Sequence, residues 1–197
     1  MVEETLPSNA ETGDYTQPAS ILSIEGRTDI ELRIATVDEG PALFDVLSKN
    51  GEHISEHQTS WALNATPETA AEHTRESVEK IATGDWLQYR VVETANPDAI
   101  VGSVTLYDRD RENHKVGLGY WIAQTATGKG YATDAARRLV QYGFEIWDVN
   151  TVELSIMETN SVSQEVARRI GAQLTDRLEP DPDDPEKTYQ VWEITRS

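Results

Sequence analysis

A turn with two glycines, placed between a strand-like run and a long apolar helix, is the part of the sequence best suited to chemistry. The turn reads Thr127-Gly128-Lys129-Gly130-Tyr131, and residues 132–147 carry apolar side chains at helical spacing. Glycine permits positive φ and the close approach of a ligand, and the unpaired N–H groups of a first helical turn attract anions. The pattern predicts a cradle for phosphate or pyrophosphate, with an ordinary strand-to-helix turn as the alternative. It matches neither the P-loop pattern nor the dinucleotide-binding glycine pattern.

The residue types present argue against a metal centre and against a cysteine or serine nucleophile. The sequence has no cysteine, which excludes disulfides, thiolate metal sites and a cysteine nucleophile. It also has no nucleophile-elbow motif around a serine. His53 and His57 have the spacing of a metal pair, but no third ligand follows at a recognisable distance. We therefore expect no metal site.

The charge balance is strongly acidic, with 35 acidic against 17 basic side chains and a formal net charge of −18. Binding of a nucleic-acid backbone needs positive patches, so we expect no nucleic-acid partner. Two interpretations of the acidic excess stay open: a solvated surface suited to a halophilic, high-salt cytoplasm, or electrostatic capture of a cationic substrate. No apolar run is long enough to span a membrane, and the first twelve residues do not resemble a secretory signal, so we expect a cytoplasmic protein.

The elements that must position the glycine turn follow from hydrophobic periodicity and from Gly and Pro punctuation. We expect residues 1–27 to form a tail or an added edge segment, and residues 28–197 to form a single domain. The periodicity predicts strands near 29–34, 86–92, 99–107, 115–123, 152–157, 173–178 and 188–195, and helices near 39–49, 66–83, 132–147 and 161–170. This order predicts an α/β (α+β) fold with a mixed, mostly antiparallel sheet of about seven strands and about four helices.

Five motifs in this order and spacing resemble the GNAT superfamily of acyl-CoA-dependent N-acetyltransferases. They are Leu32-Arg33, residues 100–104, residues 119–122, residues 128–133, and Asn160-Ser161-Val162-Ser163 followed by residues 169–172. The sequence looks most like the Rim-type branch, which acetylates the N-termini of ribosomal proteins. The resemblance implies a sheet that splays between the fourth and fifth strands to admit acetyl-CoA. It also implies direct attack of an amine on the thioester, without a covalent enzyme intermediate.

The resemblance further implies roles for individual residues. Backbone groups of Trp121 and Ile122 should pair with the pantetheine arm, and Asn160 should bond to its amide. The pyrophosphate should lie on the turn, with these residues contributing: Thr127, Gly128, Lys129, Gly130, Tyr131, Ala132 and, through its hydroxyl, Thr133. Lys129 would add a point charge. Asn160 would also suit a plain helix N-cap.

The sequence departs from the family pattern at three positions. Thr127 stands where the pyrophosphate signature begins with Arg or Gln, Gly117 where many relatives carry a glutamate base, and Ala167 where many carry a tyrosine acid. We predict instead that Ser163 is the catalytic group near the leaving thiolate. The base stays open between water and the side chains of Glu153, Glu158, Asp108, Glu112 and His114.

The acceptor is the least determined part of the prediction. We expect His53, Trp61 and Tyr89 to form one wall of the substrate site, with the acidic segment 179–186 nearby. The predicted activity is acetyl transfer from acetyl-CoA to a primary amine, such as a protein or peptide N-terminus. The alternatives are acetylation of a small amine (a polyamine, an amino acid or an aminoglycoside) and a CoA-binding module without catalysis. A homodimer is common in the family.

Overall fold

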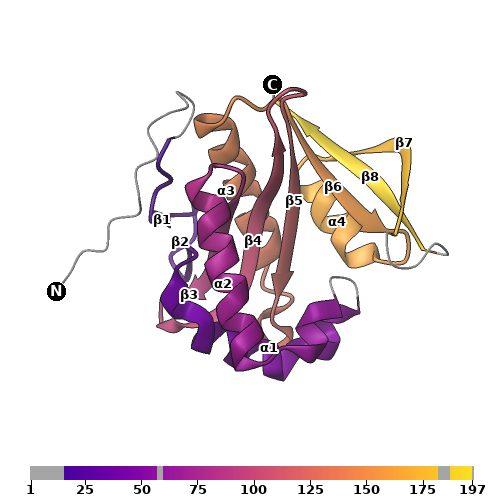
Figure 1. The fold of residues 1–197 in the computed structure, drawn as a ribbon. Coiled ribbons are helices and arrows are strands. Elements are labelled where there is room, and N and C mark those ends of the chain that lie inside the picture. Colours follow the sequence, from indigo (N-terminus) through magenta and orange to yellow (C-terminus); the bar gives the residue numbers. More distant parts are fainter. Residues whose placement is uncertain (1–15, 57–59, 182–186, 197) are drawn as a thin grey trace.

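The computed structural model describes residues 16–56, 60–181 and 187–196, and these form one sheet covered by helices on both faces (Figure 1). The sheet has eight strands in the order β1-β2-β3-β4-β5-β6-β8-β7. Its strands are β1 (Ile21–Leu22), β2 (Ile30–Ile34), β3 (Leu87–Glu93), β4 (Asn96–Asp110), β5 (Lys115–Ile122), β6 (Thr151–Met157), β7 (Gln173–Pro180) and β8 (Thr188–Thr195). The mixed, mostly antiparallel sheet agrees with the sequence-based prediction. The additional strand is the short edge strand β1, which pairs with β2.

Four α-helices cover the sheet, in agreement with the predicted number. They are α1 (Gly40–Ser55), α2 (Pro67–Ala82), α3 (Tyr131–Ile146) and α4 (Ser161–Arg169), and short 3-10 helices occur at Val37–Glu39 (η1), Ser60–Asn64 (η2) and Gln124–Ala126 (η3). The α2 boundary follows from a capping box, in which Thr66 and Thr69 each accept a hydrogen bond from the other's backbone N–H, with Pro67 at the first helical position. Among the described residues, no helix is both long and apolar enough to cross a membrane.

Two apolar clusters hold the layers together. The larger cluster packs α3 and α4 against the sheet and contains Leu106, Leu139 and Leu154, each at most 2% exposed. The smaller cluster contains Leu43 and Leu47 of α1 with Ala70 of α2 and Ile100 of β4. Because α1 and α2 lie on the face opposite α3 (Figure 1), the ends of α1 and α4 approach the central strands from different sides.

Strands β5 and β6 separate after a short parallel pairing. Only Lys115–Gly117 pair with Thr151–Glu153, whereas β5 continues to Ile122 and β6 to Met157. The remaining edge of β5 therefore faces a gap on the β6 side, although its other edge pairs with β4 as far as Ile122. The resemblance to the GNAT superfamily implied this divergence of the two strands (Figure 1). The candidate active site lies where the strands separate.

Candidate active site

A cavity of about 670 Å³ lies at the open end of the β5–β6 divergence. Five segments line it: the end of α1, the end of β5, the β5–α3 connection, the first turn of α3, and α4 with its N-cap. The lining residues are His53, Ile54, Glu56, Tyr120, Trp121, Ile122, Ala126, Thr127, Gly128, Gly130, Tyr131, Ala132, Thr133, Asn160, Ser161, Val162, Ser163, Glu165, Val166 and Arg169. The structure thus brings together Ser163, His53 and, apart from Lys129, every residue expected to contact acetyl-CoA.

The β5–α3 connection has the backbone conformation that an anion cradle requires. Gly128 and Gly130 have φ of +77° and +81°, a region that L side chains rarely adopt. Gly130 is the N-cap of α3 and has no side chain to cap the helix, so the first N–H groups of α3 are available to a ligand. A pyrophosphate therefore fits this end of the cavity.

Contacts from outside the cavity brace the cradle. Arg27 donates to the carbonyl oxygen of Lys129 at 3.2 Å and to the Asp134 carboxylate at 2.8 Å. Its guanidinium also lies over the Tyr131 ring, 4.9 Å from the centroid. The Tyr131 hydroxyl donates to Glu93 at 2.9 Å. These contacts tie the turn to β3 and to the segment that precedes β2.

Lys129 does not lie where the sequence-based prediction placed it. Its ammonium group pairs with Glu93 at 2.8 Å, and Lys129 is absent from the cavity lining. The reason is that β3 supplies a carboxylate next to the turn, which competes for the cation. Arg169, which the sequence analysis left without a role, does line the cavity, and its guanidinium pairs with Glu165 at 2.8 Å.

Asn160 and Ser163 lie at the start of α4, opposite the unpaired edge of β5. The Asn160 side-chain oxygen accepts a hydrogen bond from the Ser163 backbone N–H at 3.0 Å, so Asn160 is the N-cap of α4. The Ser163 hydroxyl lies 2.8 Å from the Tyr120 hydroxyl of β5. Tyr120 was not predicted as a site residue. It lies in the same Gly119–Ile122 motif as Trp121, and this position could have identified it.

The predicted acceptor wall is only partly assembled. His53 lines the cavity, whereas the side chain of Trp61 is outside what the structure describes, although its backbone lies in η2. Tyr89 is fully buried in the larger core, where its hydroxyl donates to the carbonyl of Ala19 at 2.7 Å and its ring meets Tyr142 edge-on. The structure therefore removes Tyr89 from the acceptor site. Of the acidic segment 179–186, residues 182–186 fall outside the described residues.

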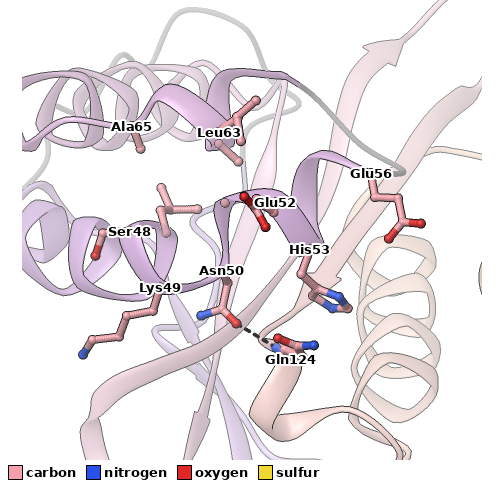
Figure 2. Close-up of a pocket in the computed structure, with 12 residues that line it drawn as sticks. Ser48, Lys49, Asn50, Glu52, His53, Glu56, Leu63, Ala65 and Gln124 are labelled. Atoms are coloured by element: carbon pink, nitrogen blue, oxygen red, sulfur yellow. Dashed lines mark hydrogen bonds between the residues drawn. The ribbon is translucent and has the colours of Figure 1, made fainter.

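A second cavity, of about 690 Å³, adjoins the first along α1 and shares His53 and Glu56 with it (Figure 2). Asn50 lies between this cavity and the β5–α3 connection. Its side-chain oxygen accepts from the Gln124 backbone N–H at 2.8 Å, as Figure 2 shows, and its amide donates to the Val46 carbonyl. In the sequence, Asn50 could have been identified as a polar residue within the apolar stripe of α1.

The position expected for a glutamate base is filled by a tyrosine ring. A Cβ atom at Gly117 would lie 2.6 Å from two ring carbons of Tyr107, so no longer side chain fits there without a shift of that ring. Of the alternative bases, Glu112 and His114 lie at the turn before Lys115, at the opposite end of β5 from the cavity. Burial would raise the pKa of the Glu153 carboxyl, but hydrogen bonds from Lys115 and Arg177 outweigh burial and lower that pKa. These placements remove Glu112 and His114 as candidate bases and leave water, Glu153, Glu158 and Asp108.

The described residues include no group of three histidine, aspartate or glutamate side chains placed to hold a metal ion. The site is thus defined by a glycine cradle at a helix N-terminus, an unpaired strand edge and a pair of hydroxyl groups.

The fold and the cavity suit a transferase whose nucleotide-linked donor would lie between two diverging strands. The family model for the acetyltransferase (GNAT) domain matches residues 29–173, so the chain belongs to the GNAT family of acetyl-CoA-dependent N-acetyltransferases. Such an enzyme transfers an acetyl group from acetyl-CoA to a primary amine.

Known proteins of this kind resemble the chain in sequence and in structure. A curated relative, "Putative ribosomal N-acetyltransferase YdaF" of Bacillus subtilis, is 26% identical over 144 residues, which cover 72% of this chain and 76% of the relative. Among solved structures, the ribosomal α-N-protein acetyltransferase RimL in complex with CoA has a TM-score of 0.78 at 18% identity, covering 87% of this chain and 97% of RimL. The microcin self-immunity acetyltransferase MccE, in complex with acetyl-CoA and AMP, has a TM-score of 0.77 at 16% identity, covering 86% and 94%.

Proposed function

We propose that this enzyme acetylates the N-terminal amine of a protein, with a ribosomal protein as the first candidate. The observation that carries the proposal is the single cavity that joins the α3 cradle, the unpaired edge of β5 and Ser163 to the end of α1. The names of the relative YdaF and of the structural neighbour RimL support a ribosomal-protein acceptor. We propose that the chain terminus enters this cavity from the α1 side, past His53 and Glu56, which line it there.

Each part of the cavity has a proposed task toward the donor. The backbone amides from Gly128 to Ala132, in the β5–α3 connection and the first turn of α3, hold the pyrophosphate, and the Thr133 hydroxyl assists them. The Thr127 N–H already donates to the Gln124 carbonyl. Backbone groups of Trp121 and Ile122 pair with the pantetheine arm, as a strand would, because this edge of β5 lacks a partner. Asn160 combines its capping role with a bond to a pantetheine amide.

The chemistry that acetyl-CoA supplies is an acetyl group activated as a thioester. The enzyme's residues orient the amine toward it, exclude competing water and stabilise the charge on the departing sulfur. We propose that the Ser163 hydroxyl donates a hydrogen bond to that sulfur and that water accepts the proton of the amine.

We further propose that the protein is adapted to high salt, that it is cytoplasmic and that it forms a homodimer. Sedimentation in solution tests the homodimer.

Activity against defined acceptors tests the proposal. Purified enzyme and acetyl-CoA are incubated with peptides that carry ribosomal-protein N-termini, with the same peptides blocked at the N-terminus, and with polyamine and aminoglycoside amines. We expect mass increases of one acetyl group on the free N-terminal peptides alone. Acetylation of the small amines only would establish the small-molecule alternative, and CoA binding without any turnover would establish a binding module.

Ser163→Ala is expected to lower kcat by about 100-fold, the lower range for removing one hydrogen-bond donor to a developing negative charge, and to leave the KM for acetyl-CoA nearly unchanged. The control is Ser155→Ala, which removes a hydroxyl that donates to Glu179 and does not line the cavity. An unchanged kcat in Ser163→Ala would remove Ser163 from the chemistry without affecting the assignment of the acceptor.

A further inference from the structure

A tyrosine and a serine from different elements share a short hydrogen bond inside the active-site cavity. The Tyr120 hydroxyl lies 2.8 Å from the Ser163 hydroxyl oxygen and 3.3 Å from the Ser163 carbonyl oxygen. Both side chains line the cavity. The contact joins β5 to α4 at the cavity that is proposed to hold the donor.

The backbone around the serine is fixed independently of this contact. Asn160 accepts from the Ser163 backbone N–H, which holds the first turn of α4. The Ser163 hydroxyl is nonetheless free to rotate about its Cα–Cβ and C–O bonds, so its proton has no single direction from the cap alone. Tyr120 is the group that restricts it.

Either hydroxyl can donate in this contact. We take the phenol, which is the more acidic of the two, as the donor and the Ser163 hydroxyl oxygen as the acceptor. Burial raises the pKa of Tyr120 to about 12, so this donor keeps its proton at the pH of the reaction. The Ser163 proton is then left for a third acceptor on the cavity side.

We propose that Tyr120 is a positioning residue that holds the Ser163 hydroxyl with its proton directed at the departing sulfur of acetyl-CoA. The inference deepens the proposed function and rests on the proposed place of Ser163 beside that sulfur. A bond forms between the amine nitrogen and the acetyl carbon, and the carbon–sulfur bond breaks with its electron pair on sulfur. The nitrogen loses its proton to water. Tyr120 and Ser163 keep their protons, and the two hydroxyls in series stabilise the thiolate.

The test that does not depend on turnover compares the binding of CoA and of acetyl-CoA at several pH values by calorimetry. Only CoA carries a thiol that titrates, so only its affinity reports on stabilisation of a thiolate. In the wild-type enzyme we expect the affinity for CoA, relative to acetyl-CoA, to rise about tenfold as the thiol ionises. The ultraviolet absorbance of the bound thiolate gives the same pKa independently.

Four variants separate positioning from packing. Tyr120→Phe keeps the ring and should reduce the tenfold rise to less than about threefold, and Ser163→Ala should abolish it. Ser163→Thr keeps the hydroxyl and should retain most of the rise. Tyr142→Phe is the matched control, because it removes another buried tyrosine hydroxyl, which accepts from the Ala19 N–H outside the cavity, and should retain the full rise. Thermal unfolding of each variant confirms that it is folded.

Steady-state kinetics supply the second arm of the test. Tyr120→Phe should lower kcat about tenfold at unchanged KM for acetyl-CoA, and it should have no further effect in the Ser163→Ala background. Equal thiolate preference in Tyr120→Phe and wild type would overturn the positioning role, and additive losses in the double variant would show that Tyr120 acts elsewhere. Loss of peptide acetylation alone would refute the proposed acceptor and leave this binding result intact.

Discussion

His73 of α2 is a histidine that the fold keeps neutral. It lies above a polar layer in which the fully buried Arg90 pairs with Glu39 of η1 and donates to Ser103 of β4 at 2.9 Å. Burial is the main reason that the pKa of His73 falls from 6.5 to about 4, and the positive charges of Arg90 and Lys80 contribute to the same shift. A proton on His73 would add a positive charge near these two cations.

This lowered pKa predicts a loss of stability in mild acid. The unfolded chain binds the His73 proton near pH 6.5 and the folded chain only near pH 4. The neutral His73 therefore contributes fully to the free energy of unfolding above about pH 6.5. This contribution, up to about 3 kcal/mol, is lost as the pH falls toward 4. Urea unfolding from pH 7.5 to 4.5 measures it, and the His73→Gln variant should show a flatter decline. Identical slopes in the two proteins would contradict the assignment.

At the scale of elements, α1 is connected to the cradle through one side chain. Asn50 is buried in the stripe of α1 that packs on the smaller core, and it accepts from the Gln124 N–H at the start of η3. Since η3 leads directly into Gly128 and Gly130, a shift of α1 is transmitted to the residues proposed to bind pyrophosphate. The hydrogen bond between Asn50 and Gln124 therefore links the lining of the second cavity to the β5–α3 connection, which lines the first.

The Asn50→Ala variant should weaken acetyl-CoA binding through the position of the cradle. Removal of the acceptor leaves the Gln124 N–H unpaired in a partly buried place, at a cost of about 1–2 kcal/mol. We expect the KM for acetyl-CoA to rise several-fold, with a smaller change in kcat. Ser48→Ala is the matched control, because Ser48 is exposed on α1 and its hydroxyl donates to the Asp45 carbonyl oxygen of its own turn. A KM change of the same size in both variants would indicate a general loosening of α1.

The elements could be predicted where their signals are local. Thr66 and Pro67 mark the start of α2, and Gly130 marks the start of α3, because caps and positive-φ turns depend on neighbours in the chain. Tyr89 could not be assigned to a face, because six of the seven residues of β3 are buried and the strand shows no alternation. The partner of Lys129 lies 36 residues away on β3, and only the sheet register brings Glu93 to it.

At the scale of the whole molecule, the net charge of −18 opposes both folding and the binding of an anionic donor. The ion pairs of the fold offset part of this repulsion locally, as Arg27 does between Asp29 and Asp134. Bonding to Arg27 lowers the pKa of Asp29 to about 2, so that carboxylate stays charged well into acid. Other carboxylates lie on solvated helix faces, among them Glu72 and Glu76, which are exposed one turn apart on α2.

Repulsion of this kind predicts a protein that salt stabilises. The Debye length falls from about 10 Å at 0.1 M to about 3 Å at 1 M, which screens most pairs of exposed carboxylates. We expect the melting temperature to rise by several degrees between 0.05 and 1 M potassium chloride, measured by calorimetry. Neutralising one like-charged pair with Glu72→Gln and Glu76→Gln should raise the free energy of unfolding at low salt by about a few tenths of a kcal/mol, and should have almost no effect at 1 M. An equal gain in the stability of the double variant at both salt concentrations would show that the gain comes from helix propensity. A wild-type melting temperature that does not change with salt would show that ion pairing already balances the acidic excess.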